Sequence, residues 1–280
     1  MQGKVVVITG GTSGIGQVSA EKLAAMGARI VLIARNKNRG EDTLGRLREI
    51  APRQNHSVHY GDVSRLNDLN RLAAEIKAAE PRIDVLINNA GAVFGERQVT
   101  EDGLELTFAT NHMSYFLLTH DLRDALLAAG AARVINTSSA AHYRAKIDFD
   151  DLQMQNNYSS FRAYGCSKLC NILFTRALVR RLEGTGITTN SLHPGFVKTR
   201  IGDGAAGFGA AIFRFMKNFA ITPEKGAETI VYLASSNDVA KTTGLYFDKC
   251  KAIEPSKLAQ DDAAAERLWQ ETAKLAGIKE

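Results

Sequence analysis

The sequence predicts an α/β fold in which a doubly wound parallel sheet of about seven strands carries helices on both faces. Two observations predict it. Continuous apolar runs of strand length alternate with segments whose apolar residues recur at the helical period, and a glycine-rich turn joins the first run to the first helical segment. Strands buried on both faces give such continuous runs, because crossover helices cover both sides of a parallel sheet.

The strands are recognised by runs rich in Val, Ile and Leu, of which Val5-Val6-Val7-Ile8 is the first. A run of this kind that is bounded by turn residues and is too short for a helix is typical of a buried strand. On this basis we expect strands at residues 5–9, 29–34, 58–60, 83–87, 133–137, 187–192 and, as a seventh, 245–247.

The helices are recognised by apolar residues spaced three and four apart and by signals at their ends. Leu66, Leu69, Leu72 and Ile76 share one face of a helix, and Gly27 stands where the end of a helix favours glycine. We expect helices at residues 14–26, 36–50, 65–79, 113–129, 161–182 and 257–275.

These elements form two successive β-α-β-α-β halves, which is the Rossmann-type arrangement. The 280 residues contain no Pro/Ser-rich linker and no short repeat, so we expect a single domain over residues 1–280. Appendages are expected at residues 142–160, at residues 200–221 and in a C-terminal helix. Residues 200–221 are rich in Gly and Ala in their first half and in Ile, Phe and Met in their second half. This pattern suits a lid over an apolar substrate, or an amphipathic helix packed on the sheet.

Composition excludes several classes of protein. The net charge of +5, from 35 Lys and Arg against 30 Asp and Glu, is spread along the chain, whereas nucleic-acid binding needs a clustered basic face. Three cysteines give no disulfide framework and suit a reducing compartment. The histidines are scattered without metal-ligand spacing, so no metal site is expected. No apolar stretch is long enough for a membrane span or a signal peptide, and we expect a cytoplasmic protein.

The turn Thr-Gly-Gly-Thr-Ser-Gly-Ile-Gly at residues 9–16 lies between the first strand and the first helix. Glycines let the backbone approach a pyrophosphate, and the helix N-terminus offers free N–H groups and the positive end of its dipole. The spacing is G-x-x-x-G-x-G rather than the commoner G-x-G-x-x-G. We expect a dinucleotide to be bound by Gly10, Thr12, Ser13, Gly14, Ile15 and Gly16.

The end of the second strand distinguishes NAD from NADP. An acidic residue there binds the ribose 2′-hydroxyl, whereas a basic residue accommodates a 2′-phosphate. The sequence has Arg35, followed by Lys37 and Arg39, with no acid before Glu41. A guanidinium is well suited to phosphate, so we expect NADP(H) to be preferred over NAD(H).

Further candidate cofactor residues follow the third and fourth strands. Ligands of open α/β sheets bind at the carboxyl ends of the strands, where Asp62-Val63 and Asn88-Asn89-Ala90-Gly91 stand. The first pair is placed to contact an adenine edge. We therefore add Asp62, Val63, Asn88, Ala90 and Gly91 to the expected cofactor site.

Tyr164 and Lys168 are the strongest candidates for chemistry. At positions i and i+4 of the expected helix 161–182 they project from one face. A phenol titrates near ~10, and a nearby ammonium lowers its pKa by favouring the phenolate. Such a tyrosine can exchange a proton with an alcohol or a carbonyl near neutral pH. No G-x-S-x-G sequence occurs, so a serine hydrolase is not indicated.

The glycine turn, Asn-Asn-Ala-Gly, the pair Ser138-Ser139 and Tyr-Gly-Cys-Ser-Lys occur in that order on the expected elements. Together they resemble the short-chain dehydrogenase/reductase family over about residues 4 to 250. The resemblance implies that Ser139 donates a hydrogen bond to the reacting oxygen, with Ser138 as the alternative. Tyr164 is then the acid/base, and Lys168 holds the nicotinamide ribose and lowers the pKa of the tyrosine.

The same resemblance implies roles for residues outside these motifs. Asn111 would organise a water and complete a proton relay. The segment that contains Pro194, Gly195, Val197 and Thr199 would close over the nicotinamide. Tyr164 and Lys168 would contribute to cofactor binding as well as to catalysis.

Within the family the chain is similar to the retinol dehydrogenase and WW-domain oxidoreductase branch. The features are Asn-Thr-Ser-Ser-Ala-Ala-His at residues 136–142, the gap of 25 positions from Ser139 to Tyr164, and Leu268-Trp269. Departures are Tyr-Gly-Cys-Ser-Lys in place of Tyr-Cys-His-Ser-Lys, and the lack of an N-terminal membrane anchor and of a WW domain. The departures concern the substrate rather than the chemistry.

The resulting expectation is an NADP(H)-dependent oxidoreductase that transfers hydride to or from an alcohol or carbonyl carbon of a lipophilic substrate, retinoid-, steroid- or xenobiotic-like. The sequence leaves the oligomeric state open: helices 113–129 and 161–182 could pair across a two-fold axis in a homodimer. Two alternatives are a catalytically idle NADP(H) sensor and an epimerase or dehydratase of nucleotide sugars, because a fold does not fix a function.

Overall fold

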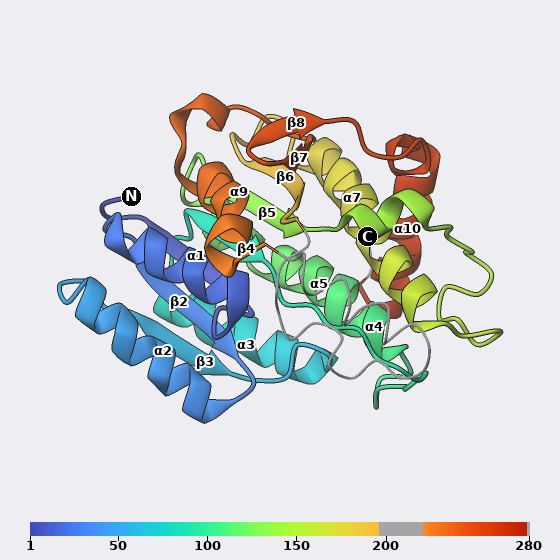
Figure 1. The fold of residues 1–280 in the computed structure, drawn as a ribbon, viewed down its shortest axis with the longest axis horizontal. Coiled ribbons are helices and arrows are strands. Elements are labelled where there is room, and N and C mark those ends of the chain that lie inside the picture. The colour runs from blue at the N-terminus through green and yellow to red at the C-terminus, as the bar shows by residue number, and fades with distance from the viewer. Residues whose placement is uncertain (196–220, 279–280) are drawn as a thin grey trace.

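The computed structural model describes residues 1–195 and 221–278. Its centre is an eight-stranded sheet with strand order β3-β2-β1-β4-β5-β6-β7-β8 (Figure 1). All neighbouring strands from β3 to β7 are parallel. The strands are β1 (Val5–Thr9), β2 (Arg29–Ala34), β3 (Ser57–Tyr60), β4 (Val85–Asn88), β5 (Arg133–Thr137), β6 (Thr188–His193), β7 (Tyr246–Asp248) and β8 (Lys251–Ile253).

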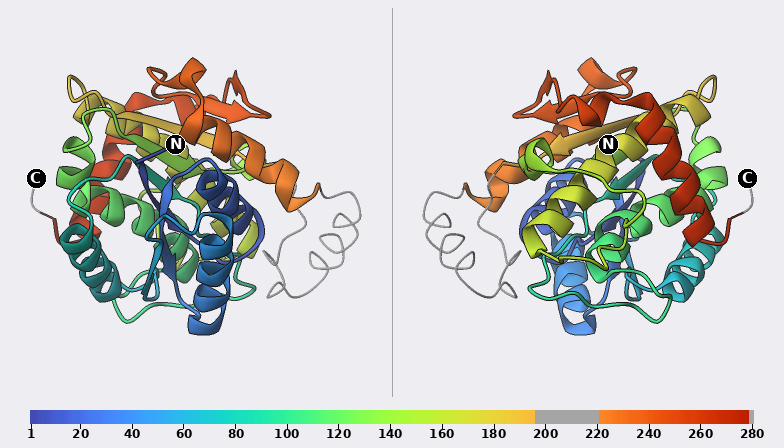
Figure 2. Two further views of the ribbon diagram at one scale, coloured as in Figure 1. Left: turned by 90° about the vertical axis from the view of Figure 1, so that its left-hand side faces the viewer. Right: turned by 90° about the vertical axis from the view of Figure 1, so that its right-hand side faces the viewer.

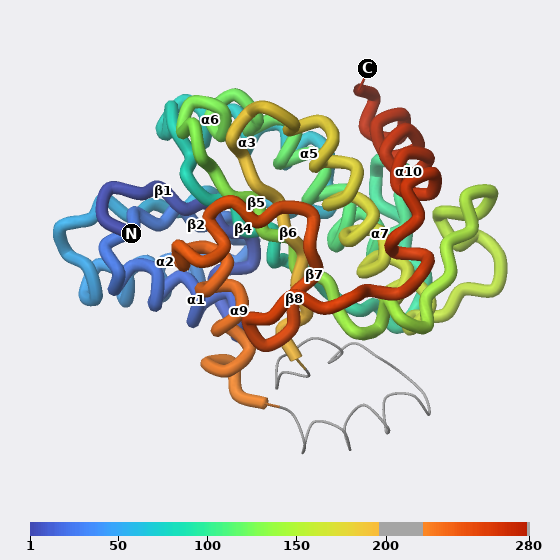
Figure 3. The backbone as a smooth tube through the Cα atoms, turned by 90° about the horizontal axis from the view of Figure 1, so that it is seen from above, coloured from blue at the N-terminus to red at the C-terminus, as the bar shows by residue number. Residues whose placement is uncertain are grey.

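Helices cover both faces of the sheet, which confirms the doubly wound architecture (Figure 3). One layer contains α1 (Gly14–Ala25), α2 (Lys37–Ile50) and α9 (Pro223–Ser235). The other contains α3 (Leu66–Ala79), α4 (Leu106–Phe108), α5 (Ser114–Asp121), α6 (Arg123–Leu127) and α7 (Ser160–Arg181), with α10 (Asp262–Leu275) packed on α7. A separate buried apolar cluster fills the space on each side of the sheet.

The strand order places the functional edge of the sheet. Strand β1 pairs with β2 on one side and with β4 on the other. Successive strands are therefore added to the sheet in one direction from β1 to β3 and in the opposite direction from β4 onward. Open α/β sheets bind ligands beyond the carboxyl ends of the strands at this point. The turn after β1, the turn after β4 and the N-terminus of α1 meet there.

The prediction of one continuous helix over residues 113–129 is wrong. Residues Ala109–Met113 form a π-helical turn, followed by α5 and then by the short α6. The apolar pattern runs through all three, so periodicity alone does not reveal the break. Widened π turns of this kind are frequent at functional sites, and Asn111 stands at the centre of this one.

Strand β8 is absent from the sequence-based assignment and pairs antiparallel with β7. The hairpin turns at Lys249 and Cys250, whose φ angles are 48° and 61°. A two-residue turn with both central φ angles positive usually contains Asn-Gly or Asp-Gly, and neither dipeptide occurs here. The turn therefore carries no recognisable signal in the sequence.

Helix α10 packs along α7 (Figure 2). It is held there by ion pairs with arginines of α7 and by an aromatic cluster that includes side chains of α5 and α7. The ring of Trp269 lies 4.8 Å from that of Phe116 and 5.8 Å from that of Phe174, and the guanidinium of Arg181 lies 4.0 Å above the indole. Part of the surface of α5 and α7 that could pair in a homodimer is thus occupied by α10, and the homodimer stays a prediction. No helix within the described ranges is both long and apolar enough to cross a membrane, and the cytoplasmic location stays a prediction too.

Candidate active site

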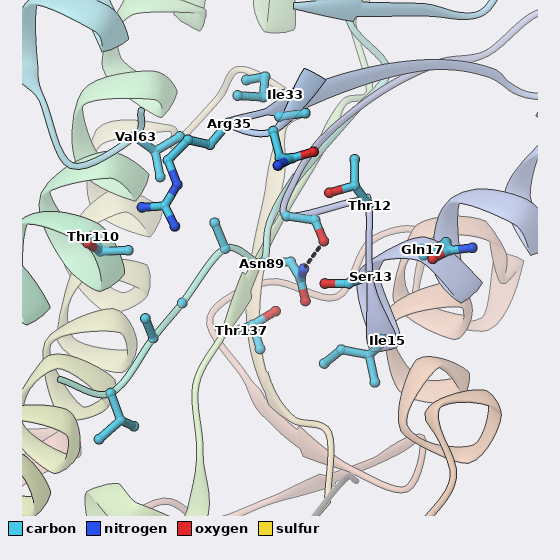
Figure 4. A pocket seen from close by; sticks show the side chains of 18 of the residues that line it. Thr12, Ser13, Ile15, Gln17, Ile33, Arg35, Val63, Asn89, Thr110 and Thr137 are labelled. Carbon is cyan, nitrogen blue, oxygen red and sulfur yellow. Dashed lines mark hydrogen bonds between the residues drawn. The ribbon is translucent and has the colours of Figure 1, made fainter. Parts of the chain in front are cut away.

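A pocket of about 1100 Å³ opens beyond the carboxyl ends of β1, β2, β4 and β5. Figure 4 shows Thr12, Ser13 and Ile15 on one side of it, Val63 and Thr110 on the other, and Asn89 between them. The expected cofactor residues that line the pocket are Gly10, Thr12, Ser13, Gly14, Ile15, Arg35, Asp62, Val63, Ala90, Gly91, Tyr164, Lys168 and Pro194. Lining residues that are not among the expected cofactor residues include Gln17, Asn36, Arg39, Asn89, Val93, Phe94 and Thr110.

The glycine turn needs its glycines because other backbone lies against it. Gly10 has a φ of +65°, and a Cβ there would come 2.9 Å from the Cα of Ala90. Gly16 does not line the pocket; a Cβ at this position would lie 2.3 Å from the Gly10 carbonyl oxygen and 2.5 Å from Nδ2 of Asn89. Gly16 therefore allows α1 to pack closely on the turn rather than touching a ligand itself.

Gly16→Ala is expected to destabilise the protein by about 1–3 kcal/mol and to weaken dinucleotide binding, because the clashing carbonyl belongs to the turn itself. Gly45→Ala is the matched control. Gly45 is within α2, and no atom beyond its own stretch of helix backbone lies within 4 Å of its added Cβ, so this change is expected to stabilise by about 0.5–1 kcal/mol. Chemical denaturation of both variants measures the contrast. Equal effects would contradict the packing role of Gly16.

The turn after β4 is bound to the glycine turn by Asn89, the neighbour of the expected Asn88. The Asn89 amide donates to the Thr9 and Gly10 carbonyls, at 3.1 and 3.3 Å. Asn88 lies outside the pocket lining: its side chain is buried on the other face of the strand end and donates to Thr119 and to Asn136. Successive side chains of a strand point to opposite faces, and the sequence pair Asn-Asn does not show which member faces the ligand.

Arg35 and Asp62 form the far end of the pocket. The Arg35 guanidinium is largely exposed and lies 3.4 Å from the Asp62 carboxylate. Although burial opposes it, hydrogen bonds from Ser64 and the charge of Arg35 lower the pKa of Asp62. Arg39, in the first turn of α2, also lines this end. Two guanidinium-bearing residues therefore stand where the sequence places the 2′-position of the ribose.

Tyr164 and Lys168 lie on α7 and line the same pocket. The Lys168 ammonium lies 5.7 Å from the centre of the Tyr164 ring and donates to the Thr137 carbonyl at 3.0 Å. Burial lowers the pKa of Lys168 to about 7. Burial also raises the pKa of Tyr164, against a hydrogen bond from Ser139 that lowers it. The expected lowering of the tyrosine pKa is thus not seen here, because burial disfavours the phenolate and the hydrogen bond from Ser139 does not offset it.

The two serines after β5 have different environments. The Ser138 hydroxyl is buried and donates to the Lys168 carbonyl at 2.6 Å. The Ser139 hydroxyl accepts from the Ala141 N–H at 3.2 Å and also hydrogen-bonds to the Tyr164 phenol. Ser138 is therefore engaged in holding α7 against the sheet, and Ser139 is the serine that reaches the tyrosine.

Asn111 is fully buried behind the pocket wall and does not line the pocket. Its amide accepts from the Ala92 N–H at 2.8 Å and donates to the Ala92 carbonyl and to Ser167, both at 3.0 Å. A Cβ at Gly91 would come 3.4 Å from the Asn111 amide oxygen and 3.2 Å from the Lys168 ammonium. Gly91 thus leaves room for both side chains.

The last expected segment is described only in part. Pro194 lines the pocket, and Gly195, with a φ of +87°, lies against Ile221. Val197, Thr199 and the expected lid up to residue 220 lie outside the described residues. The lid and the closing segment therefore stay predictions.

These features fit a nicotinamide dinucleotide. The glycine turn provides a close backbone approach, and helix α1 has no acidic residue in its first turn and no side-chain cap from Ser13. Its first N–H groups and the positive end of its dipole therefore face the pocket, an arrangement that suits a pyrophosphate. Within residues 1–195 and 221–278, no cluster of three or more His, Cys, Asp or Glu side chains is arranged to hold a metal ion. Cys166 and Cys170 pack in the apolar core.

Comparison with known proteins agrees with this geometry. The sequence profile of the short chain dehydrogenase family matches residues 4–207. Human retinol dehydrogenase 13 is 38% identical over 99% of this chain and 86% of its own length, and mouse retinol dehydrogenase 12 is 39% identical over 99% and 87%.

Solved structures have the same fold. An uncharacterized protein from Mycobacterium paratuberculosis matches with a TM-score of 0.81 and 30% identity, over 99% of this chain and 95% of its own. A short chain dehydrogenase from Escherichia coli, solved in complex with NADPH, matches with a TM-score of 0.71 and 21% identity, over 89% and 97%.

Proposed function

Because the chain belongs to the short-chain dehydrogenase family, we propose that it transfers hydride between NADP(H) and the alcohol or carbonyl carbon of a lipophilic substrate. One observation carries the proposal. Tyr164, hydrogen-bonded to Ser139 and neighbouring Lys168, lines the same pocket as the glycine turn. An acid/base group and a dinucleotide cradle thus share one cavity.

In this proposal some residues of the pocket bind the cofactor and others transfer the proton. Gly10, Ser13 and Ile15 would hold the pyrophosphate, and Lys168 would hold the nicotinamide ribose. The dinucleotide supplies or accepts the hydride. At the substrate oxygen, Tyr164 gives or takes the proton through its phenol oxygen, and Ser139 donates a hydrogen bond that polarises the bond to carbon.

Lys168 and Asn111 assist Tyr164 without contacting the reacting carbon. A protonated Lys168 favours the phenolate of Tyr164. With a pKa of about 7, the lysine changes its charge near neutral pH. Asn111 holds the wall residue Ala92 by two hydrogen bonds. We propose that it keeps the lysine end of the pocket in shape for the relay of the proton to solvent.

Arg35 and Arg39 support a preference for NADP(H), as does the NADPH-bound relative of the same fold. Arg35→Glu is expected to weaken NADPH binding at least tenfold, about 1.4 kcal/mol, because it removes a phosphate-binding guanidinium and adds a repelling charge. NADH binding should be retained or improved. Titration of the protein with both cofactors, followed by fluorescence, measures the change.

Lys37→Glu is the control for Arg35→Glu. It makes the same change of charge two residues away, in the first turn of α2, and Lys37 does not line the pocket. We expect this variant to keep the cofactor preference. A wild-type protein with clearly better kcat/KM for NADH would remove the argument from Arg35.

The relatives named retinol dehydrogenases support a lipophilic substrate, and so do the apolar residues Val93 and Phe94 in the pocket wall. The direct test is a panel of alcohols, aldehydes and ketones of increasing apolar size, followed by NADPH absorbance. The proposal expects higher kcat/KM for large apolar members. Equal values for small polar and large apolar substrates would remove the lipophilic class, and no turnover with any member would favour a sensor.

A further inference from the structure

Two buried histidines lie between the proposed catalytic residues and the C-terminal segment, residues 254–275. His142 follows Ser139 in a short 3₁₀ turn, and His112 follows Asn111 in the π-helical turn. Both rings are fully buried. Each bonds on one side to a group beside the proposed active site and on the other side to the C-terminal segment.

His142 connects Ser139 to Ser256. Its Nδ1 lies 2.7 Å from the Ser139 carbonyl oxygen, and its Nε2 accepts from the Ser256 backbone N–H at 3.1 Å. The ring is also packed edge-on against Tyr246, with 4.9 Å between centroids. The backbone of Ser139, whose hydroxyl reaches Tyr164, is therefore held by a residue more than a hundred positions later.

His112 connects Asn171 to Thr272 in α10. Its Nε2 lies 3.0 Å from the Thr272 hydroxyl and its Nδ1 lies 3.3 Å from the Asn171 amide oxygen. The Asn171 amide nitrogen donates to the carbonyls of Asn111 and Thr137, at 2.9 and 3.1 Å. The Thr137 carbonyl is also the acceptor of the Lys168 ammonium, at 3.0 Å.

The partners fix where each ring carries its proton. A carbonyl only accepts and a backbone N–H only donates, so His142 has its proton on Nδ1. The Asn171 amide nitrogen is committed to two carbonyls, so its oxygen accepts from Nδ1–H of His112, and the Thr272 hydroxyl donates to Nε2. Burial lowers the pKa of both imidazoles, that of His112 to about 4, so both stay neutral and keep this tautomer at neutral pH.

We propose that the C-terminal segment is a positioning element for the reaction. Through His112 and Asn171, Thr272 holds the carbonyl to which Lys168 is bound. Through His142, Ser256 holds the backbone of Ser139. The inference rests on the proposed function, since it concerns the residues that would move the proton there. It differs from a purely structural role of α10, which the aromatic cluster around Trp269 already fulfils.

The test compares Thr272→Val with Thr272→Ser. Valine has the shape of threonine without the hydroxyl, whereas serine keeps the donor to His112. We expect Thr272→Val to lower kcat about tenfold, since a small misplacement of a reacting group has effects of this order or larger. The apparent pKa of the kcat profile should shift by at least about 0.5 unit, whereas KM should change less. Thr272→Ser should restore kcat and the pH profile.

Two further measurements do not depend on turnover. The ¹⁵N resonances of the wild-type histidines should show His112 protonated on Nδ1. Binding of NADPH by Thr272→Val, followed by fluorescence, should be weaker than by Thr272→Ser, because Lys168 is the shared contact. A protonated Nε2 on His112 would overturn the proposal without any substitution.

The outcomes separate this inference from the proposed function. If wild-type protein turns over no alcohol or carbonyl, the function fails, and the tautomer and the NADPH titration still decide the inference. If wild-type protein is active and both Thr272 variants have the same kcat and pH profile, the positioning role is wrong. A lower Tm of Thr272→Val with unchanged kcat shows a structural role only, and likewise refutes it.

Discussion

Tyr164→Phe is expected to reduce kcat by at least about a hundredfold, the usual scale of acid–base catalysis. The change removes the only atom of this side chain that can give or take a proton, and it leaves the ring in its place on α7. The Ser139 hydroxyl then loses its hydrogen bond with the residue 164 side chain but still accepts a hydrogen bond from the Ala141 N–H. We therefore expect the Tm and the binding of NADPH to change little.

The measurement is steady-state kcat with the best substrate of the carbonyl panel, beside NADPH binding and thermal unfolding. Tyr232→Phe is the matched control, since it makes the same chemical change on α9, outside the pocket, and should retain wild-type kcat. Near-normal turnover of Tyr164→Phe would falsify the assignment of Tyr164 as the acid/base and would make Lys168 the next candidate for that role.

The positions of the strands could be predicted because each carries a short-range signal. Apolar runs flanked by turn residues mark β1, β2 and β4 most clearly, and shorter apolar or β-branched stretches mark the other strands up to β7. The order of motifs along the chain places the glycine turn, the Asn-Asn turn and Tyr164 at one edge of the sheet. Strand β8 and the π-helical turn carry no such signal, because a turn of two non-glycine residues and a widened helix depend on tertiary contacts.

In the pocket, too, the residues with a local sequence signal could be predicted and those that depend on tertiary contacts could not. The sequence identified about half of the pocket lining, namely the residues at the ends of recognisable strands and in the tyrosine motif. It did not separate Asn88 from Asn89, since which of the two side chains faces the ligand depends on where the strand ends. It also did not predict the pKa of Lys168. The sequence shows the ammonium near the phenol, whereas the desolvation of both groups comes from the packing of α7 on the sheet.

The partners of Asn171, His112 and Thr272 are beyond any sequence pattern. Thr272 is 160 positions from His112 and approaches it only because α10 lies along α7. Long-range pairs between single polar side chains leave no periodicity, so buried histidines look the same in a sequence whether they bridge two elements or merely fill space.

Lys168→Met is expected to abolish most of the activity and yet to raise the Tm. Methionine has a similar length and no charge, so it removes the donor that would hold the cofactor ribose and favour the phenolate. The loss of such a group costs about a hundred- to a thousandfold in kcat. The gain in stability arises because the buried ammonium is costly: burial lowers the pKa of Lys168 from 10.5 to about 7.

The dependence on pH follows from the sign of this shift. Between pH values of about 7 and 10.5 the unfolded chain binds a proton at residue 168 that the folded chain releases, so wild-type stability rises with pH in this window. The penalty is fully present below a pH of about 7, where both states are protonated. Lys168→Met has no such group. Its Tm should therefore exceed that of wild type most at or below a pH of about 7, by at least about 3 °C, and the difference should shrink as the pH rises.

Thermal unfolding of both proteins from about pH 6 to about pH 9, beside kcat, decides the matter. Lys77→Met makes the same change at an exposed position in the last turn of α3 and should alter neither kcat nor the slope of Tm with pH. A Lys168→Met variant whose Tm follows the wild-type curve would show that the buried lysine is not desolvated as the structure indicates. Retained kcat would show that the lysine does not serve the reaction. A lysine kept in a costly buried position with both effects present is explained by function, since the fold would be more stable without it.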